Sequence, residues 1–310
     1  VLKIIGDKDT VKSVDLKISE DKTVNLKVKN LIVGCGGLEN SRILLWSKET
    51  ADNGFLRDLQ IGHYWMEHPH YEVGAFIGEF SDIKKIFNTQ FSKYNEIYFA
   101  PSGFFLKKNK IKNISLRFQY QFDDEFIKNT LVDLKCSGPK YFQKLLKDFK
   151  KNQLCSFKIQ AIWEQPPFFD NKIKLSTNLR DKNNIPQIEL YWKKKEIEKK
   201  APRIFLNELG NYFKNNQKGR IGILNFLNPE NNFFPSTTHP GGHHHLGGTR
   251  MGYSTRDNDI VDKNLKVFGV NNLYIVGSSV FRTGGHANPT LSIVQLSLRL
   301  ADYLVNKQNI

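Results

Sequence analysis

Two segments of the sequence, one near each end, share the same order of elements: a short apolar strand, a turn of small residues and a helix. The first covers residues 31–46, with its turn at 34–37, and the second covers residues 273–305, with its turn at 277–279. Strand, glycine turn and helix in this order are typical of an α/β sheet, where ligands bind at the carboxyl ends of the strands. The two segments therefore predict an α/β domain assembled from both ends of the chain.

The helix at 290–305 has a clear beginning in the sequence. Asn288 can cap free backbone N–H groups, and Pro289 suits the first helical position. The positive end of the helix dipole then points at whatever lies beyond Asn288. One apolar stripe is expected to be buried, formed by Leu291, Val294, Leu298, Ala301 and Val305.

The rest of the chain follows a different pattern. Alternating polar and apolar residues predict a β-hairpin with strands at 14–18 and 24–28. Further short strands are expected in an antiparallel sheet with helices laid on it, at 114–118, 157–163, 172–175 and 187–192. Apolar spacing predicts a helix over 196–213, and the loop at 225–242, rich in Asn, Pro and Gly, should return the chain to the first domain.

Composition limits the possible partners and surroundings. Lys and Arg number 46 against 31 Asp and Glu, a net charge of +15, but the charges are scattered, which favours a solvated surface over a nucleic-acid groove. Three widely spaced cysteines, Cys35, Cys136 and Cys155, fit a reducing, cytoplasmic setting. No apolar run approaches the roughly 18 residues that a membrane-spanning helix needs.

Specific motifs lie in the last quarter of the chain. They are His245-Leu-Gly-Gly-Thr-Arg-Met-Gly252, the strand and turn at 272–281, and Gly285-His-Ala-Asn288-Pro-Thr290. Together with Val33-Gly-Cys-Gly-Gly-Leu-Glu-Asn-Ser-Arg42, they resemble the glucose-methanol-choline (GMC) family of flavin oxidoreductases. The resemblance implies a fold of the α/β plus α+β class. Parts of an FAD-binding, Rossmann-like domain, residues 1–75 and 239–310, would enclose a substrate-binding domain of antiparallel sheet and helices at 76–238.

The resemblance also implies the roles of individual residues. His245 would remove the hydroxyl proton of an alcohol or sugar while hydride passes to flavin N5, and imidazole chemistry suits that task. Its competing interpretation is an exposed or structural member of three consecutive histidines. Asn288 would hydrogen-bond the substrate oxygen, or else serve only as a helix cap; His286 is not expected to share that role. Contacts to FAD are expected from Gly36, Gly37, Asn40, Gly277, Ser278, Asn288, Pro289 and Thr290.

A metal site is the alternative for the remaining histidines. Glu67-His-Pro-His70 could be combined with His243 and His244. Nothing in the spacing requires this, and Pro69 prevents a helical pair of ligands. The string Tyr64-Trp-Met-Glu-His-Pro69 also resembles a family segment near the flavin domain. We therefore expect structural or cofactor-proximal packing and no metal.

The sequence begins without the Gly-rich fingerprint that would hold the FAD pyrophosphate. The later segment Gly34-Cys-Gly-Gly-Leu-Glu39 only partly matches this fingerprint, because Glu39 stands where the third Gly should be. We expect an FAD-dependent alcohol or sugar dehydrogenase or oxidase in which this chain is the C-terminal part of a larger enzyme or of a split one, the latter completed by a complementary N-terminal polypeptide. The alternative is an inactive remnant, or a module that binds an anionic ligand or a protein. The motifs leave open the substrate, the electron acceptor, the linkage of the flavin and the oligomeric state.

Overall fold

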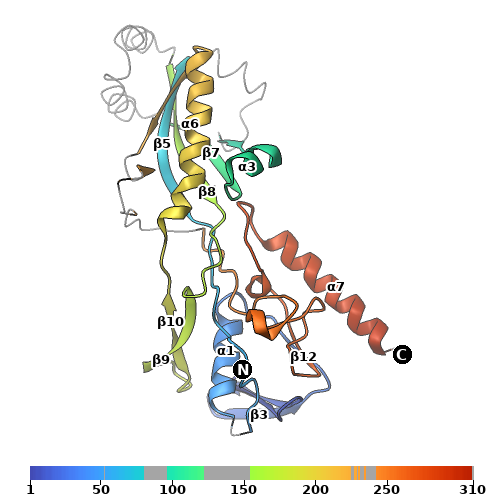
Figure 1. The fold of residues 1–310 in the computed structure, drawn as a ribbon. Coiled ribbons are helices and arrows are strands. Elements are labelled where there is room, and N and C mark those ends of the chain that lie inside the picture. Colours follow the sequence, from blue (N-terminus) through green and yellow to red (C-terminus); the bar gives the residue numbers. More distant parts are fainter. Residues whose placement is uncertain are drawn as a thin grey trace. The chain divides into compact units, whose positions relative to one another are not determined.

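The computed structural model divides the chain into two compact units (Figure 1). Unit 1 comprises Val1–Glu67, Gln165–Lys193 and His243–Ile310, and unit 2 comprises His68–Glu164 and Lys194–Gly242. The structure describes residues 1–51, 53–79, 96–121, 154–224, 227–228, 230, 234 and 242–308. Most of the predicted loop at 225–242, the predicted domain boundary at 238 and Cys136 lie outside the described residues.

Unit 1 opens with the predicted hairpin, which extends to a three-stranded antiparallel sheet. Its strands are β1 (Lys3–Gly6), β2 (Val11–Ser19) and β3 (Lys22–Lys27). Strand β4 (Leu31–Val33) follows and leads through the glycine turn into helix α1 (Glu39–Glu49).

The two ends of the chain meet in a parallel strand pair. Strand β12 (Leu273–Ile275) runs parallel to β4, with Tyr274 opposite Ile32. After β12 come a short 3₁₀ turn, η5 (Ser278–Val280), and helix α7 (Thr290–Gln308). A further 3₁₀ turn, η4 (Thr255–Asp257), lies before β12. Both strand–turn–helix predictions are confirmed, and together with the antiparallel sheets they make a mixed α/β chain.

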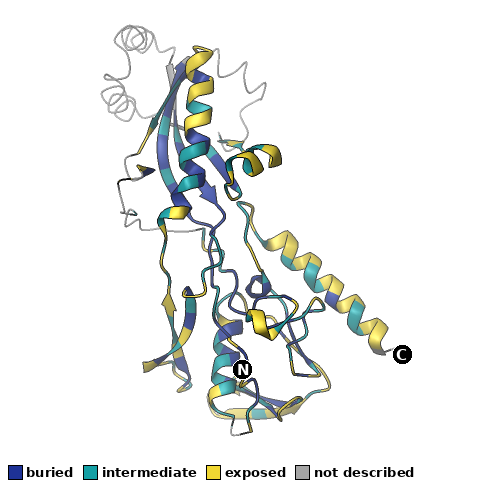
Figure 2. Ribbon diagram, viewed as in Figure 1, coloured by how far each residue is buried: buried dark blue, intermediate teal, exposed yellow. Residues whose placement is uncertain are grey.

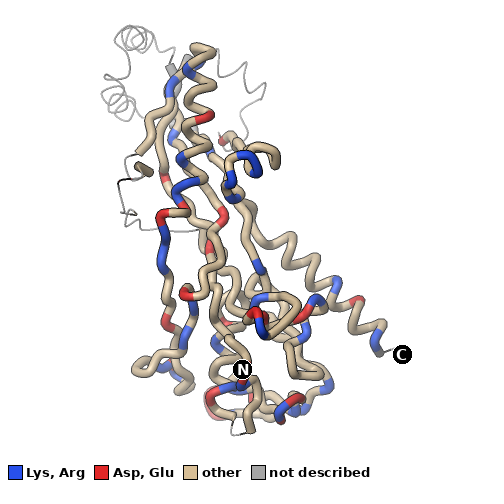
Figure 3. The backbone as a smooth tube through the Cα atoms, viewed as in Figure 1, with Lys and Arg blue, Asp and Glu red and all other residues tan. Residues whose placement is uncertain are grey.

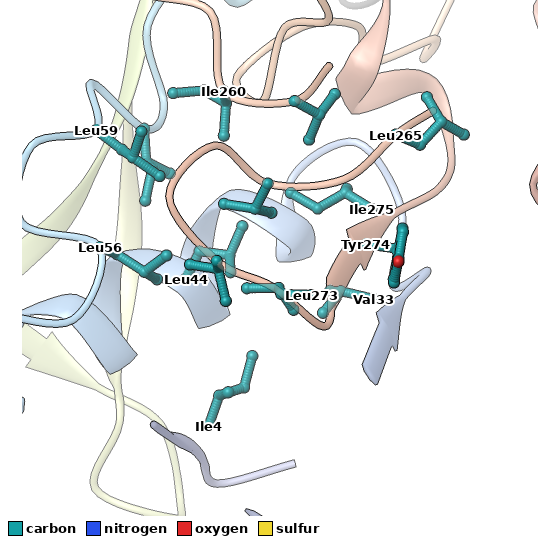
Figure 4. Close-up of a cluster of buried hydrophobic side chains, with 14 of the residues drawn as sticks. Ile4, Val33, Leu44, Leu56, Leu59, Ile260, Leu265, Leu273, Tyr274 and Ile275 are labelled. Atoms are coloured by element: carbon teal, nitrogen blue, oxygen red, sulfur yellow. The ribbon is translucent and has the colours of Figure 1, made fainter. Parts of the chain in front are cut away.

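A hydrophobic core holds these elements together (Figure 4). Leu44 of α1 and Leu273, Tyr274 and Ile275 of β12 are fully buried in it. Ile4 of β1 joins the same cluster. Burying side chains of this size stabilises the fold by about 1.5–3 kcal/mol each, so this core fixes the strand pair on which both turns stand.

Helix α7 is largely exposed (Figure 2), and the face that it presents to this core differs from the predicted one. Leu300 is buried in the cluster, and Leu296, Tyr303 and Leu304 pack against it. The predicted stripe of Leu291, Val294, Leu298, Ala301 and Val305 is exposed instead. The prediction was wrong because the helix carries two apolar faces, and periodicity alone does not say which of them meets this core.

Residues 165–193 also differ from the prediction. Strands β9 (Lys172–Arg180) and β10 (Pro186–Tyr191) form a two-stranded antiparallel hairpin that belongs to unit 1, whereas the sequence assigned them to the sheet of the middle domain. Arg42 of α1 explains the difference, because its guanidinium forms an ion pair with Asp181 at 2.6 Å and donates to Pro186 O at 2.7 Å. The hairpin is thereby held to α1.

Unit 2 is built on an antiparallel sheet with strand order β11-β5-β8-β7-β6. Its elements are β5 (His70–Glu79), β6 (Glu96–Phe99), α3 (Gly103–Asn109), β7 (Ile114–Gln121), β8 (Leu154–Trp163), η2 (Glu196–Lys199), α6 (Lys200–Asn215) and β11 (Gly219–Ile223). Ala201, Phe205 and Leu206 of α6 are buried in the core of this unit. The predicted sheet with a helix laid on it is confirmed, although the first turn of the helix is 3₁₀, which leaves Ile197 exposed.

Lys and Arg are distributed over both units (Figure 3). Several form ion pairs, as Arg42 does with Asp181 and Lys12 with Asp7. The basic residues are scattered, as the sequence indicated.

Candidate functional site

His245 lies in a segment that pairs with residues 64–67 of the same unit. Met66 and Leu246 exchange two backbone hydrogen bonds, Met66 N to Leu246 O at 2.8 Å and Leu246 N to Met66 O at 2.9 Å. The buried Trp65 ring faces the imidazole of His245 with 5.7 Å between ring centroids. The backbone pairing and the ring contact therefore fix the orientation of the His245 side chain.

The two small-residue turns hold the backbone of His245 from either side. Ser278 donates its hydroxyl to His245 O at 2.6 Å. A Cβ on Gly37 would come within 2.3 Å of the same oxygen, so only glycine permits this approach. Gly37, His245 and Ser278, which the sequence assigned to one site from three separate motifs, are thus in direct contact.

Asn40 connects the turn after β4 with the turn after β12. Its side chain is fully buried, accepts from Cys35 N at 2.7 Å, and donates to Val276 O at 2.9 Å and Ser279 Oγ at 2.8 Å. Both amide hydrogens are therefore engaged by protein. Asn40 contributes to this site by holding the turns after β4 and β12 in register.

The glycines that flank this network have left-handed backbones. Gly36 has φ +98° and Gly277 has φ +112°. A Cβ at Gly36 would meet no atom within 4 Å, so the turn presents bare backbone to open space. In α/β sheets, cofactors bind at exposed backbone at the carboxyl ends of parallel strands. The backbone at Gly36 and Gly277 therefore suits the predicted contact with FAD.

Asn288, Pro289 and Thr290 lie at the beginning of α7. Asn288 and Thr290 are exposed, and Pro289 O accepts the first helical hydrogen bond, from Ile293 N at 3.0 Å. Among the residues that the structure describes, no hydrogen bond joins Asn288 to His245. The chain that follows Ser278 connects these three residues to the site.

The electrostatic setting of His245 favours the neutral imidazole. Partial burial lowers the pKa of His245, and the neighbouring His243 and His244 lower it further by charge repulsion. His245 Nδ1 is buried and has no hydrogen-bond partner among the described residues. A neutral, partly buried imidazole can accept a proton at physiological pH.

Two structural features around this loop have only weak signals in the sequence. Glu67 Oε1 accepts from His244 N at 3.0 Å, which engages the carboxylate considered above as a metal ligand. Arg250 pairs with the fully buried Asp259 at 3.0 Å and lies over the Tyr64 ring at 3.8 Å. The string Tyr64-Trp-Met-Glu67 pointed to this packing, whereas nothing in the sequence linked Arg250 to Asp259.

A comparison with protein families gives a direct match to this region. A model described as GMC oxidoreductase matches residues 167–297. This part of the chain is therefore similar to GMC oxidoreductases. The match includes the His245 loop, β12 and the beginning of α7.

Two of the relatives that this chain matches are named as dehydrogenases. The fructose dehydrogenase large subunit of Gluconobacter japonicus is 28% identical over 164 residues, which are 53% of this chain and 28% of the relative. The 2-methyl-1,2-propanediol dehydrogenase of Mycolicibacterium austroafricanum is 26% identical over 141 residues, 46% of this chain and 24% of the relative. The matched stretches thus span about a quarter of these relatives.

Solved structures share the fold. Pyridoxine 4-oxidase from Mesorbium loti has a TM-score of 0.53 at 12% identity and covers 98% of this chain, which spans 56% of it. An FAD-dependent oxidoreductase from Chaetomium thermophilum has a TM-score of 0.52 at 13% identity, with 100% of this chain covered and 61% of that one. Among the described residues, no helix is long and apolar enough to cross a membrane.

Proposed function

We propose that this chain contributes the catalytic part of an FAD-dependent enzyme that oxidises an alcohol or sugar hydroxyl to a carbonyl. The observation that carries the proposal is the setting of His245: its backbone is fixed by Gly37 and Ser278, its ring contacts Trp65, and burial lowers its pKa. The named activities of the two dehydrogenase relatives support the same reaction class.

His245 acts as the base in this proposal. With a lowered pKa, the imidazole is neutral at physiological pH and takes the hydroxyl proton as the carbonyl forms. Its fixed backbone supplies orientation, which in a bimolecular reaction is worth several orders of magnitude in rate. Bound FAD supplies the hydride acceptor.

Other residues of this chain shape the site. The backbone at Gly36 and Gly277 and the N-terminal end of α7 would hold the cofactor, because free N–H groups and the helix dipole favour the negative charge of a reduced flavin. Asn288, exposed at that helix end, is assigned to the substrate oxygen. Oxygen and other electron acceptors are equally compatible with these residues.

We further propose that FAD is held fully only when a dinucleotide-binding βαβ unit completes the site, whether it belongs to a larger chain or to a separate polypeptide. The spans of 56% and 61% of the solved relatives support this, because the remainder of that fold has no counterpart in these 310 residues.

Flavin absorbance tests the proposal. The purified chain is titrated with FAD, alone and with the N-terminal portion of the fructose dehydrogenase large subunit, and then mixed anaerobically with a panel of alcohols and sugars. Bleaching of the flavin by a member of the panel is the expected result. Flavin uptake in neither sample, or uptake without bleaching by any alcohol, would contradict the proposal and favour a remnant or a binding module.

A further inference from the structure

Helix α6 and strand β11 of unit 2 enclose a cavity of about 220 Å³. The helix packs beside this strand, which stands at one end of the strand order in its sheet (Figure 1). Leu206 and Ile221 form the apolar part of the lining. Pockets for drug-sized molecules have volumes of roughly 300–1,000 Å³ and combine an apolar lining with a few polar groups. This cavity therefore suits a small metabolite.

Three polar side chains of α6 line the cavity in a row. Asn207, Asn211 and Lys214 follow one another at intervals of four and three residues, which places them on one face of the helix. In the described part of the chain, no hydrogen bond or ion pair engages these three side chains. Amide groups both donate and accept hydrogen bonds, whereas the ammonium group only donates. The row can therefore bind hydroxyl groups along the amides and a negative group at Lys214.

The charged side chains that line the cavity are both positive. Arg220 approaches it from β11 and Lys214 from α6, and no carboxylate is among the described lining residues. Arg220 donates one N–H to Gly219 O at 2.9 Å, and a guanidinium carries five donors. Glu208 follows Asn207 by one residue and so projects about 100° further around the helix, outside the lining face. The cavity therefore favours an anion.

Gly210 keeps the cavity open in the middle of this row. A glycine inside a helix is destabilising relative to alanine. A Cβ at this position would meet only Ile221 Cβ, at 3.8 Å, which is an ordinary contact, so the packing of α6 on β11 does not require glycine. A larger side chain would occupy the cavity instead. A ligand that approaches the helix at this point accounts for the glycine.

We propose that this cavity binds a small hydroxylated anion, a sugar phosphate or a sugar acid. Its negative group lies between Lys214 and Arg220, where hydrogen bonds are charge-assisted, and its hydroxyl groups lie along Asn207 and Asn211. Lys214 also belongs to the last turn of α6, where a cation offsets the helix dipole. That role alone would leave Gly210 and the two amides unexplained. The proposal is independent of flavin and of the reaction assigned to unit 1.

Calorimetry and hydrogen exchange on the full chain test the proposal. The probes are glucose 6-phosphate, gluconate and, as the neutral control, glucose. At least one of the two anions should bind one-to-one and slow exchange at residues 206–214 and 219–223, and the tighter anion identifies the negative group that is recognised. Glucose should leave exchange in these two segments unchanged.

Matched variants locate the site. Lys214→Met should weaken binding of the anion about tenfold or more, because it removes a hydrogen bond from a charged donor. Gly210→Leu should abolish binding by filling the cavity. Lys107→Met, at an exposed lysine of α3 that does not line the cavity, should bind like the wild type. Thermal unfolding of each variant separates a loss of binding from a loss of fold.

Three results would overturn the proposal. The first is that neither anion slows exchange at residues 206–214 and 219–223. The second is that glucose protects these segments as well as the anions do, since the site would then recognise hydroxyl groups alone. The third is that Lys214→Met and Lys107→Met weaken binding equally, which would mean a general attraction of anions to a positively charged surface.

Discussion

Replacing Gly37 by alanine tests how His245 is held. The new Cβ would lie 2.3 Å from His245 O, 2.7 Å from its Cβ and 2.8 Å from its carbonyl carbon. Contacts below 3.0 Å are essentially never observed, so His245 has to move by roughly 0.7 Å. Gly37 does not have a positive φ, so the contact and not backbone strain decides the outcome. We expect a loss of about 1–3 kcal/mol in the free energy of unfolding.

The same displacement should slow the reaction. A shift of about 1 Å in a reacting group lowers the rate about 10²-fold, and we expect a loss of this order in the flavin-loaded assembly. Urea unfolding and single-turnover bleaching measure the two effects. Gly103→Ala is the control, because its Cβ meets nothing within 4 Å. If Gly37→Ala matched the wild type in stability and in rate, the packing argument would be refuted.

Three further outcomes follow from the structure. Asn40→Ala should lower the free energy of unfolding by about 3 kcal/mol, because it removes three hydrogen bonds, one of them buried and two part-buried; a loss under about 1 kcal/mol in urea titration would contradict this. Leu300→Ala should cost about 2–5 kcal/mol and Leu298→Ala less than about 0.5 kcal/mol, so equal losses would contradict the burial of one face only. As the pH is lowered, the bleaching rate should fall to half only below pH of about 6.5, because protonation at the lowered pKa of His245 removes the base. A rate that is already halved above this pH would exclude His245 as the base.

The sequence predicted local structure well where one pattern had one solution. Residues 31–33 and 273–275 were predicted as short apolar strands, and the small-residue turns after them indicated a change of direction. Strand 273–275 is buried, whereas Ile32 at the centre of strand 31–33 is exposed. The motifs around Gly37, His245 and Ser278 then indicated residues that the fold brings into contact.

Packing between elements was not predictable in the same way. The helix at 290–308 has two apolar stripes of similar length, and only the core formed by other elements decides which one is buried. Likewise, alternation predicted β9 and β10 as strands, but their place in unit 1 depends on Arg42, far away in sequence. The sequence did not indicate the hydrogen-bond partners of the buried Asn40 amide, because these partners come together only when the two turns have assembled.

The most direct test of the central claim is the anaerobic rate of flavin bleaching in the completed assembly, measured for wild type, His245→Ala and the control His243→Asn. Asn suits the control position because His243 is exposed and has φ +59°. If His245 is the base, all three samples take up FAD equally, and only His245→Ala loses most of its bleaching rate. Bleaching of His245→Ala at the wild-type rate would contradict the claim.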